Sequence, residues 1–292
     1  MKRSIALTAS AALAVALAGC GQDPEPTDED YITDLVAASP YTQDGSLDGQ
    51  GGGGQDDVGL PEAWWRELTG LGQPTVVFEN DPATGVCTLT VNRPLIAELN
   101  IDVVWDGQLT PGTKDIDVLR TRRVVVVKTG DSSDPYGGWA VSAVTPAEFV
   151  LNSDIEQEVF IQSMAFYMSD SLIWECGSPE DFYAVPGDLP VVQFGSLCRL
   201  EATVLHTNPV ETPPYFVYVH GPLPAWQRHL MYDNGTMGDL VADDGIYTYE
   251  WYAEDTIDPR VIAADVIDAD TFADQTEQDY DSGAWSIPYV GI

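Results

Sequence analysis

The sequence predicts a mainly β protein, with a small α+β antiparallel-sheet domain at residues 61–150 followed by an antiparallel β-sandwich at residues 151–292. One observation is alternation with a period of two, as in Cys87, Leu89 and Val91, which is typical of half-buried antiparallel strands. Another is that short strand-like runs in the second half are separated by Gly, Pro and Asp turns, which favours a sandwich. That half, about 140 residues, is ample for one hydrophobic core.

Residues 1–19 have the pattern of an export signal. Lys2 and Arg3 form a charged start, and the Ala-rich apolar run after them is too short to span a bilayer comfortably. The run ends in Leu17-Ala18-Gly19-Cys20, which resembles the bacterial lipobox, where the signal is cut before the cysteine and the cysteine carries lipid. The resemblance implies lipidation of Cys20 and anchoring to the membrane through this lipid. No Asp follows Cys20 directly, which favours the outer membrane or cell surface; a plain secretory peptide is the alternative.

Residues 20–60 predict an acidic, Gly-rich tether that includes the run Gly51–Gly54. Such a composition cannot bury enough apolar surface to fold by itself. Within it, Tyr31–Val36 could form a short helix or a weakly ordered island.

The chain is strongly acidic, with 47 Asp and Glu against 12 Lys and Arg and a net charge of −35. A chain this acidic repels phosphate backbones, so a nucleic-acid partner is excluded and cations are the natural small partners. Alternatively, the acidity only keeps an exported protein soluble or suits a saline habitat.

Expected elements of the first domain are a short helix followed by strands. The helix is predicted at Pro61–Leu68, with Pro in the first turn. The strands are expected at Thr75–Glu79, Val86–Asn92, Leu95–Val103, Arg123–Thr129 and Gly138–Val144. This order loosely resembles the cone-shaped NTF2-like domains, although their usual pair of long N-terminal helices is not evident. The resemblance implies a pocket in residues 61–150 for a glycan or a small molecule.

The second domain is expected to consist of short strands. They are predicted at Val159–Met168, Cys198–Val204, Tyr215–Val219, Tyr247–Trp251 and Val261–Ile267.

The most specific stretch of the mature chain is the Asp-rich segment 233–248. Asn234-Gly235 and Asp244-Gly245 are strong hairpin-turn dipeptides, so the segment could be a turn-rich connection and nothing more. It could also be a Ca²⁺ loop, because Ca²⁺ takes six to eight oxygen ligands from carboxylates and backbone carbonyls. The spacing differs from that of an EF-hand. The candidate side-chain ligands of a structural Ca²⁺ are Asp233, Asn234, Asp239, Asp243 and Asp244.

The same segment carries a resemblance through the pattern D-N-G-x-x-G-D-x-x-A-x-D-G-I-Y-T. It is similar to a signature of immunoglobulin-like (Ig-like) β-sandwich modules in secreted and surface-anchored bacterial proteins. The resemblance implies an Ig-like antiparallel β-sandwich for residues 151–292. It implies little about activity, since such modules are attached to many functions.

Three cysteines remain beside Cys20. Export permits disulfides, and Cys176 and Cys198 share a domain, so we expect them to pair and Cys87 to stay a buried free thiol. Closing a loop of about 20 residues contributes roughly 3 kcal/mol in the chain-entropy model. The alternative is three reduced, buried cysteines.

No catalytic motif is evident. His206, His220 and His229 lack metal-ligand spacing and are interpreted as structural, and the acidic loop Asp268–Asp274 is interpreted as a solvated turn. The leading hypothesis is an exported, lipid-anchored, non-catalytic interaction, adhesion or scaffolding module with a protein or glycan partner. The alternatives are a glycan- or small-molecule-binding lipoprotein using a pocket in 61–150, and a hydrolase with an unrecognised site.

Overall fold

The computed structural model describes residues 25–42, 49–51, 63–104, 108–152, 156–209, 214–220, 228–254, 261–273 and 279–292. These residues form a mainly β protein built from antiparallel sheets, which confirms the predicted fold class at this level. Cys20 lies outside the described residues. None of the helices in the described part is long and apolar enough to cross a bilayer.

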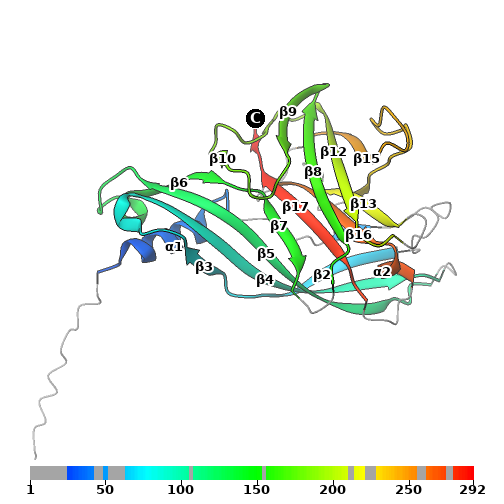
Figure 1. The fold of residues 1–292 in the computed structure, drawn as a ribbon, viewed down its shortest axis with the longest axis horizontal. Coiled ribbons are helices and arrows are strands. Elements are labelled where there is room, and N and C mark those ends of the chain that lie inside the picture. Colours follow the sequence, from blue (N-terminus) through cyan, green and yellow to red (C-terminus); the bar gives the residue numbers. More distant parts are fainter. Residues whose placement is uncertain are drawn as a thin grey trace, which may run out of the picture.

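Twelve strands form one large sheet that curls into a half-barrel (Figure 1). They are β1 (Gly49–Gly51), β2 (Ala63–Leu71), β3 (Thr75–Phe78), β4 (Val86–Asp102), β5 (Gly112–Lys128), β6 (Trp139–Val144), β7 (Ala147–Leu151), β10 (Tyr183–Ala184), β13 (Tyr215–His220), β14 (His229–Leu230), β16 (Val261–Asp268) and β17 (Ser282–Pro288). The main path runs β1-β2-β4-β5-β7-β17-β16-β13-β14, and β3, β6 and β10 pair beside it.

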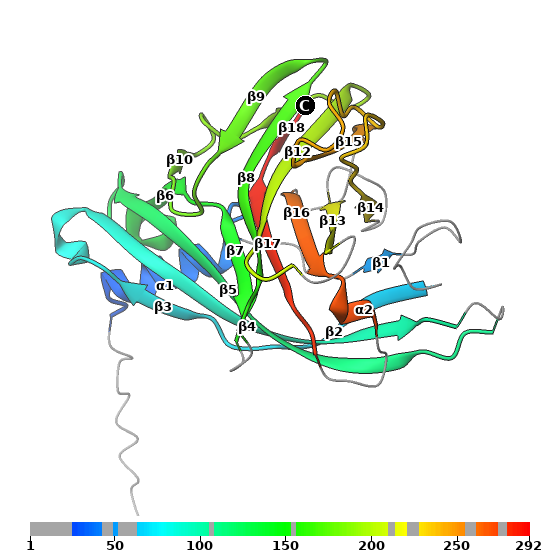
Figure 2. The same ribbon diagram turned by 45° about the vertical axis from the view of Figure 1, so that its right-hand side comes forward.

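A second, four-stranded sheet stands against the large one (Figure 2). Its order is β15 (Ile246–Tyr252), β12 (Leu197–His206), β8 (Val159–Met168) and β9 (Ser171–Cys176), and β8 packs on β16 and β17. A parallel pair joins β11 (Val191–Val192) to β18 (Val290–Gly291). The helical elements are α1 (Asp28–Ala38), the short turns η1 (Pro82–Thr84) and η2 (Pro135–Gly138), and α2 (Asp270–Ala273).

Strand β2 replaces the short helix expected at Pro61–Leu68, and that expectation is wrong for the described residues from Ala63 onward. Trp64 and Arg66 are buried while Glu67 is exposed, which is the alternation of a strand. Antiparallel pairing with β4 satisfies the backbone that a helix would have satisfied internally.

Strand β4 continues through Pro94, where two separate strands were expected. Val91 and Leu95 share one face, so the alternation keeps its phase across the proline. Strand β3 pairs with β4 as far as Asn92, and β2 pairs with β4 from Leu95 onward. Pro94 lies between these two pairings, so its missing N–H breaks no bond to either strand.

The large sheet is continuous across residue 150. Strand β7 pairs with β5 on one side and with β17 on the other. Side chains from both parts of the chain therefore fill the same two hydrophobic cores.

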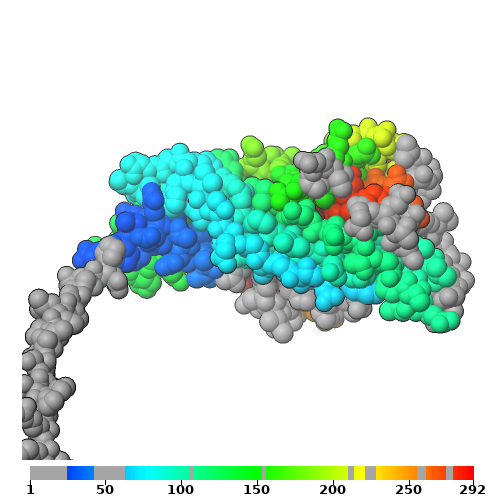
Figure 3. Space-filling model, turned by 90° about the horizontal axis from the view of Figure 1, so that it is seen from below, coloured from blue at the N-terminus to red at the C-terminus, as the bar shows by residue number. Residues whose placement is uncertain are grey.

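Helix α1 lies within the expected tether 20–60, and the blue residues of this part of the chain lie against the rest of the molecule in Figure 3. Thr27 and Asp30 form a capping box, which satisfies free N–H groups at the start of the helix. Ile32, Leu35 and Val36 are buried, and α1 packs against β6, η1 and η2. This part of the segment therefore belongs to the folded body.

The large sheet curls so that β2 and β16 come close, and a buried ion pair connects the two strands. The two guanidinium Nη atoms of Arg66 donate to the Asp265 carboxylate at 2.8 and 3.2 Å. Both side chains are almost fully buried. Burial acts to raise the pKa of Asp265, but the Arg66 charge and the neighbouring His220 and Arg228 lower it well below its usual range.

We predict that Asp265→Asn lowers the free energy of unfolding by about 3–5 kcal/mol, because it leaves Arg66 buried without its counter-charge. Urea unfolding at pH 7 measures the loss. The control is Glu79→Gln, which breaks the partly exposed Arg123–Glu79 pair and should cost under about 1 kcal/mol. Equal losses in the two variants would contradict the importance of the buried pair.

Candidate functional site

Three of the five predicted Ca²⁺ ligands converge in the loop that leads into β15. Carboxylate oxygens of Asp233, Asp239 and Asp244 all lie within 4.8 Å of one another. Two ligands of one Ca²⁺, each at about 2.3–2.6 Å, can be no farther apart than roughly this distance. The donor set and its spacing therefore fit a hard divalent cation.

Backbone hydrogen bonds fix these carboxylates. Asp233 accepts the N–H groups of Asp244 and Gly245 at 3.0 and 2.8 Å, which closes the loop. Asp239 accepts those of Gly235 and Val241 at 2.6 and 3.0 Å. A carboxylate has about four acceptor positions, so an oxygen that accepts one N–H can still face a cation.

The other two predicted ligands lie differently. The Asn234 side-chain oxygen accepts the N–H and hydroxyl of Thr236. Asp243 is outside the converging group and has a left-handed backbone with φ of 60°. Gly238, with φ of 90°, holds the loop close to β15, where a Cβ would come within 2.3 Å of Glu250.

The structure does not bring Cys176 and Cys198 together. Cys176 on β9 opposes Met164, and Cys198 on β12 opposes Met168, so β8 lies between them. Two strand spacings are about 9.5 Å, beyond the roughly 7 Å that a disulfide bridges between Cα atoms. Both thiols are free and buried, as is that of Cys87, and burial raises the pKa of Cys198 to about 11.

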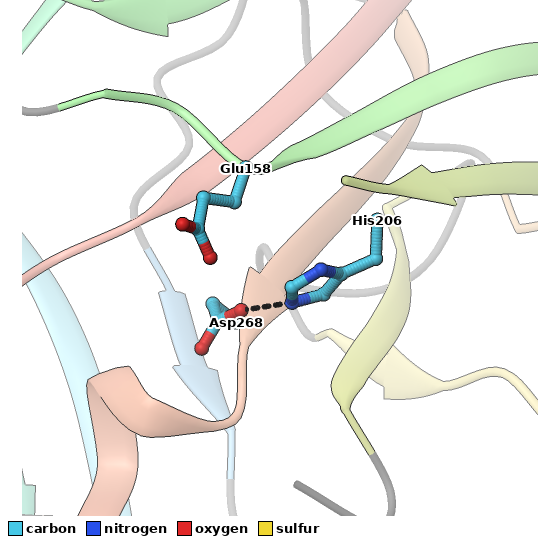
Figure 4. A group of neighbouring side chains, drawn as sticks. All are labelled: Glu158, His206 and Asp268. Atoms are coloured by element: carbon cyan, nitrogen blue, oxygen red, sulfur yellow. Dashed lines mark hydrogen bonds and ion pairs between the residues drawn. The ribbon is translucent and has the colours of Figure 1, made fainter. Parts of the chain in front are cut away.

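A second polar group, absent from the expectations, joins the two sheets (Figure 4). Glu158 precedes β8, His206 ends β12 and Asp268 ends β16. One ligand atom from each lies within 4.8 Å of the others. His206 Nε2 lies 2.5 Å from Asp268 Oδ2.

The hydrogen bonds of this group place its protons. Asn208 N–H donates to His206 Nδ1 at 3.0 Å, so the neutral ring carries its proton on Nε2 and donates it to Asp268. A metal at Nε2 would have to displace this proton, because a ligating nitrogen must be deprotonated. In this form the group is a hydrogen-bonded junction.

Asp281, at the start of β17, completes the junction. Its Oδ2 accepts the Glu158 N–H at 2.7 Å. Burial and the nearby Asp268 and Glu158 charges raise the pKa of Asp281 to about 6, against the hydrogen bond from Glu158. Burial also raises the pKa of Asp268.

Sequence reasoning noted His206 and Asp268 separately and missed Glu158. Their meeting depends on pairing between β8 and β12 and on the packing of β8 against β16, and no sequence spacing records either. The sequence also carries a signal for the buried charges around Arg66: Asp265 is the lone charged residue in the apolar run 261–267.

Comparison of the chain with protein-family models, curated proteins and solved structures gives no match.

We predict that Asp281→Asn stabilises the protein at pH 7.5 by about 1–2 kcal/mol, a figure reduced from the full pKa shift because the group is partly exposed. The folded carboxyl holds its proton more tightly than the unfolded one. Wild type therefore loses stability as the pH rises from about 4 to about 6, and the amide does not. Urea unfolding at pH 4 and 7.5 should show the gain only at the higher pH.

Exposed Glu67→Gln is the control and should show no such difference. If Asp281→Asn destabilises the protein at pH 7.5, the junction requires the carboxylate charge and this account of it is wrong.

Proposed function

We propose that the chain is an exported, lipid-anchored cell-envelope protein of the outer membrane or cell surface that acts as a non-catalytic interaction, adhesion or scaffolding module. The observation that supports this most is the apolar tip of loop 233–245. Met237, Leu240 and Val241 are 41, 81 and 58% exposed. Large apolar side chains gathered on an exposed, polar-rimmed loop mark contact surfaces.

The tip is well suited to binding because its backbone is fixed. Asp239, which precedes Leu240, accepts the Val241 N–H and the Gly235 N–H, so both ends of the tip are tied to one carboxylate. A pre-organised loop loses less conformational entropy when a partner binds.

Anchoring through Cys20 would keep this body near the membrane. Residues 21–27 separate Cys20 from α1, and seven residues span at most about 25 Å when fully extended. Because α1 packs on the folded body, the tether residues that follow α1 do not lengthen the link between Cys20 and this body.

The Ig-like assignment of residues 151–292 belongs to the same proposal. It is supported by the two-layer packing of the four-stranded sheet on β16 and β17. Strand β17 also pairs with β7, so this sandwich would share its second sheet with residues before 151.

A structural Ca²⁺ held by Asp233, Asp239 and Asp244 would stiffen the loop further. It would relieve the repulsion between carboxylates held this close. The small-molecule alternative draws support from a different feature, the cavity beside Arg66.

We predict that millimolar Ca²⁺ raises the melting temperature of the mature chain carrying Cys20→Ser by about 1–5 °C relative to EDTA. Ligand at one to ten times Kd stabilises by only about 0.4–1.4 kcal/mol, which limits the rise. Asp239→Asn should abolish the rise and Asp243→Asn should keep it, since of these two residues only Asp239 belongs to the converging group. No rise in wild type, together with no heat of Ca²⁺ binding in calorimetry, would leave a turn held by hydrogen bonds alone.

We also predict that Leu240→Ser with Val241→Ser weakens binding of the purified protein to envelope preparations of its own host at least tenfold. Its melting temperature should stay within about 1 °C, because the replaced side chains are exposed. The matched control is Leu109→Ser, 64% exposed and outside the loop, which should bind as wild type does. Equal binding by the double variant and wild type would show that the loop is not the contact surface.

A further inference from the structure

The concave side of the large sheet holds more buried positive than negative charge around Asp265. Arg66 lies 2.8 Å and Arg228 lies 3.7 Å from the same Asp265 oxygen. His220 adds no further positive charge, because burial and then the Arg228 charge lower its pKa to about 4. One carboxylate thus faces two guanidinium groups, and one positive charge is left over.

Arg228 carries the excess positive charge. Its side chain is fully buried, and within the described part of the chain none of its three guanidinium nitrogens has a hydrogen-bond partner. The group lies 5.0 Å from the centre of the Trp64 ring, a favourable contact that supplies no acceptor. Its pKa is lowered to about 9, first by burial, so it still carries its charge at neutral pH. Buried charges are normally paired and hydrogen-bonded.

A cavity of about 30 Å³ adjoins this cluster. Arg66 and Tyr280 are its polar lining residues, and the walls are aliphatic: Leu68, Leu95, Ala97, Ile116 and Val118. Two donors are free among these polar residues. Arg66 Nε has no hydrogen-bond partner among the residues that the structure describes, and the Tyr280 hydroxyl accepts from Ser282, which leaves its own hydrogen to donate.

The cavity shares the lining residues Ala97, Ile116 and Tyr280 with a second hollow of about 470 Å³. About 30 Å³ holds roughly two water molecules, the size of one carboxylate group. The hollow lies within the range of small-molecule sites, about 300–1,000 Å³. Glu98, Asp115 and Asp117 line the hollow and disfavour ligands that carry negative charge near that end.

We propose that this cavity and hollow bind a small amphipathic carboxylate, with its carboxylate at Arg66 and Tyr280 and its aliphatic part along Ala97 and Ile116. A single carboxylate matches the one surplus positive charge and the two free donors. A phosphate dianion brings more charge and more acceptors than the cavity supplies. Burial of the aliphatic part offsets repulsion from the acidic residues of the hollow.

The probe is octanoate, with 1-octanol as its uncharged counterpart, added to the mature chain carrying Cys20→Ser at pH 7. Calorimetry should show octanoate binding at least tenfold more tightly than octanol. Ala97→Leu, which fills the cavity, should weaken octanoate binding at least tenfold without lowering the melting temperature. The readouts are independent of Ca²⁺ and of loop 233–245.

The decisive variant is Arg228→Met, which removes the surplus charge while leaving the lining of the cavity intact. It should bind octanol as wild type does and lose the preference for octanoate. The proposal is overturned if wild type does not bind millimolar octanoate, if octanol binds equally well, or if Arg228→Met keeps the preference.

Discussion

The buried pair between Arg66 and Asp265 is the interaction on which the curl of the large sheet depends. Along the sheet, β4, β5, β7 and β17 separate the strands that carry the two residues, yet their charged groups meet at 2.8 Å. Two ions so deeply buried are stable only when paired. A flatter sheet would part them, so the pair specifies how far the sheet closes. Arg66 lies over the Trp64 ring, and Tyr218 and Phe272 pack against Trp64.

Charge is segregated between the interior and the surface. Of 12 Lys and Arg in the chain, six are buried among the described residues: Arg66, Lys114, Arg120, Arg122, Arg199 and Arg228. Four aspartates are buried as well, namely Asp102, Asp239, Asp265 and Asp268, so the described interior holds two more positive than negative side chains. Arg66 and Arg228, both beside Asp265, place an attraction for anions inside the curl.

Local alternation predicted strands such as β4 and β12, because a half-buried strand records its own burial pattern in sequence. The prediction failed at Pro61–Leu68, where Pro in the first turn favoured a helix and pairing with β4 decided otherwise. Strand β16 explains another limit. It is buried on both faces, so its run of apolar residues showed no alternation to indicate that Asp265 faces the concave side.

Sites were predictable only where their residues are close in sequence. The Asp-rich loop was recognised because Asp233 and Asp244 lie in one turn-rich segment, although which of its acids converge was not. The junction at His206 and the cluster at Asp265 gather residues from distant strands, and the Cys176–Cys198 pairing ignored the strand between them. In each case sheet order, which no local pattern encodes, sets the geometry.

The most direct test of this account is a double-mutant cycle on Arg66→Met and Asp265→Asn, measured by urea unfolding at pH 7. If the pair closes the sheet, the two substitutions should be coupled by about 2–3 kcal/mol, near the upper end of values for contacting residues. A coupling below about 0.5 kcal/mol would show that the curl is held by the surrounding apolar packing and would contradict the account.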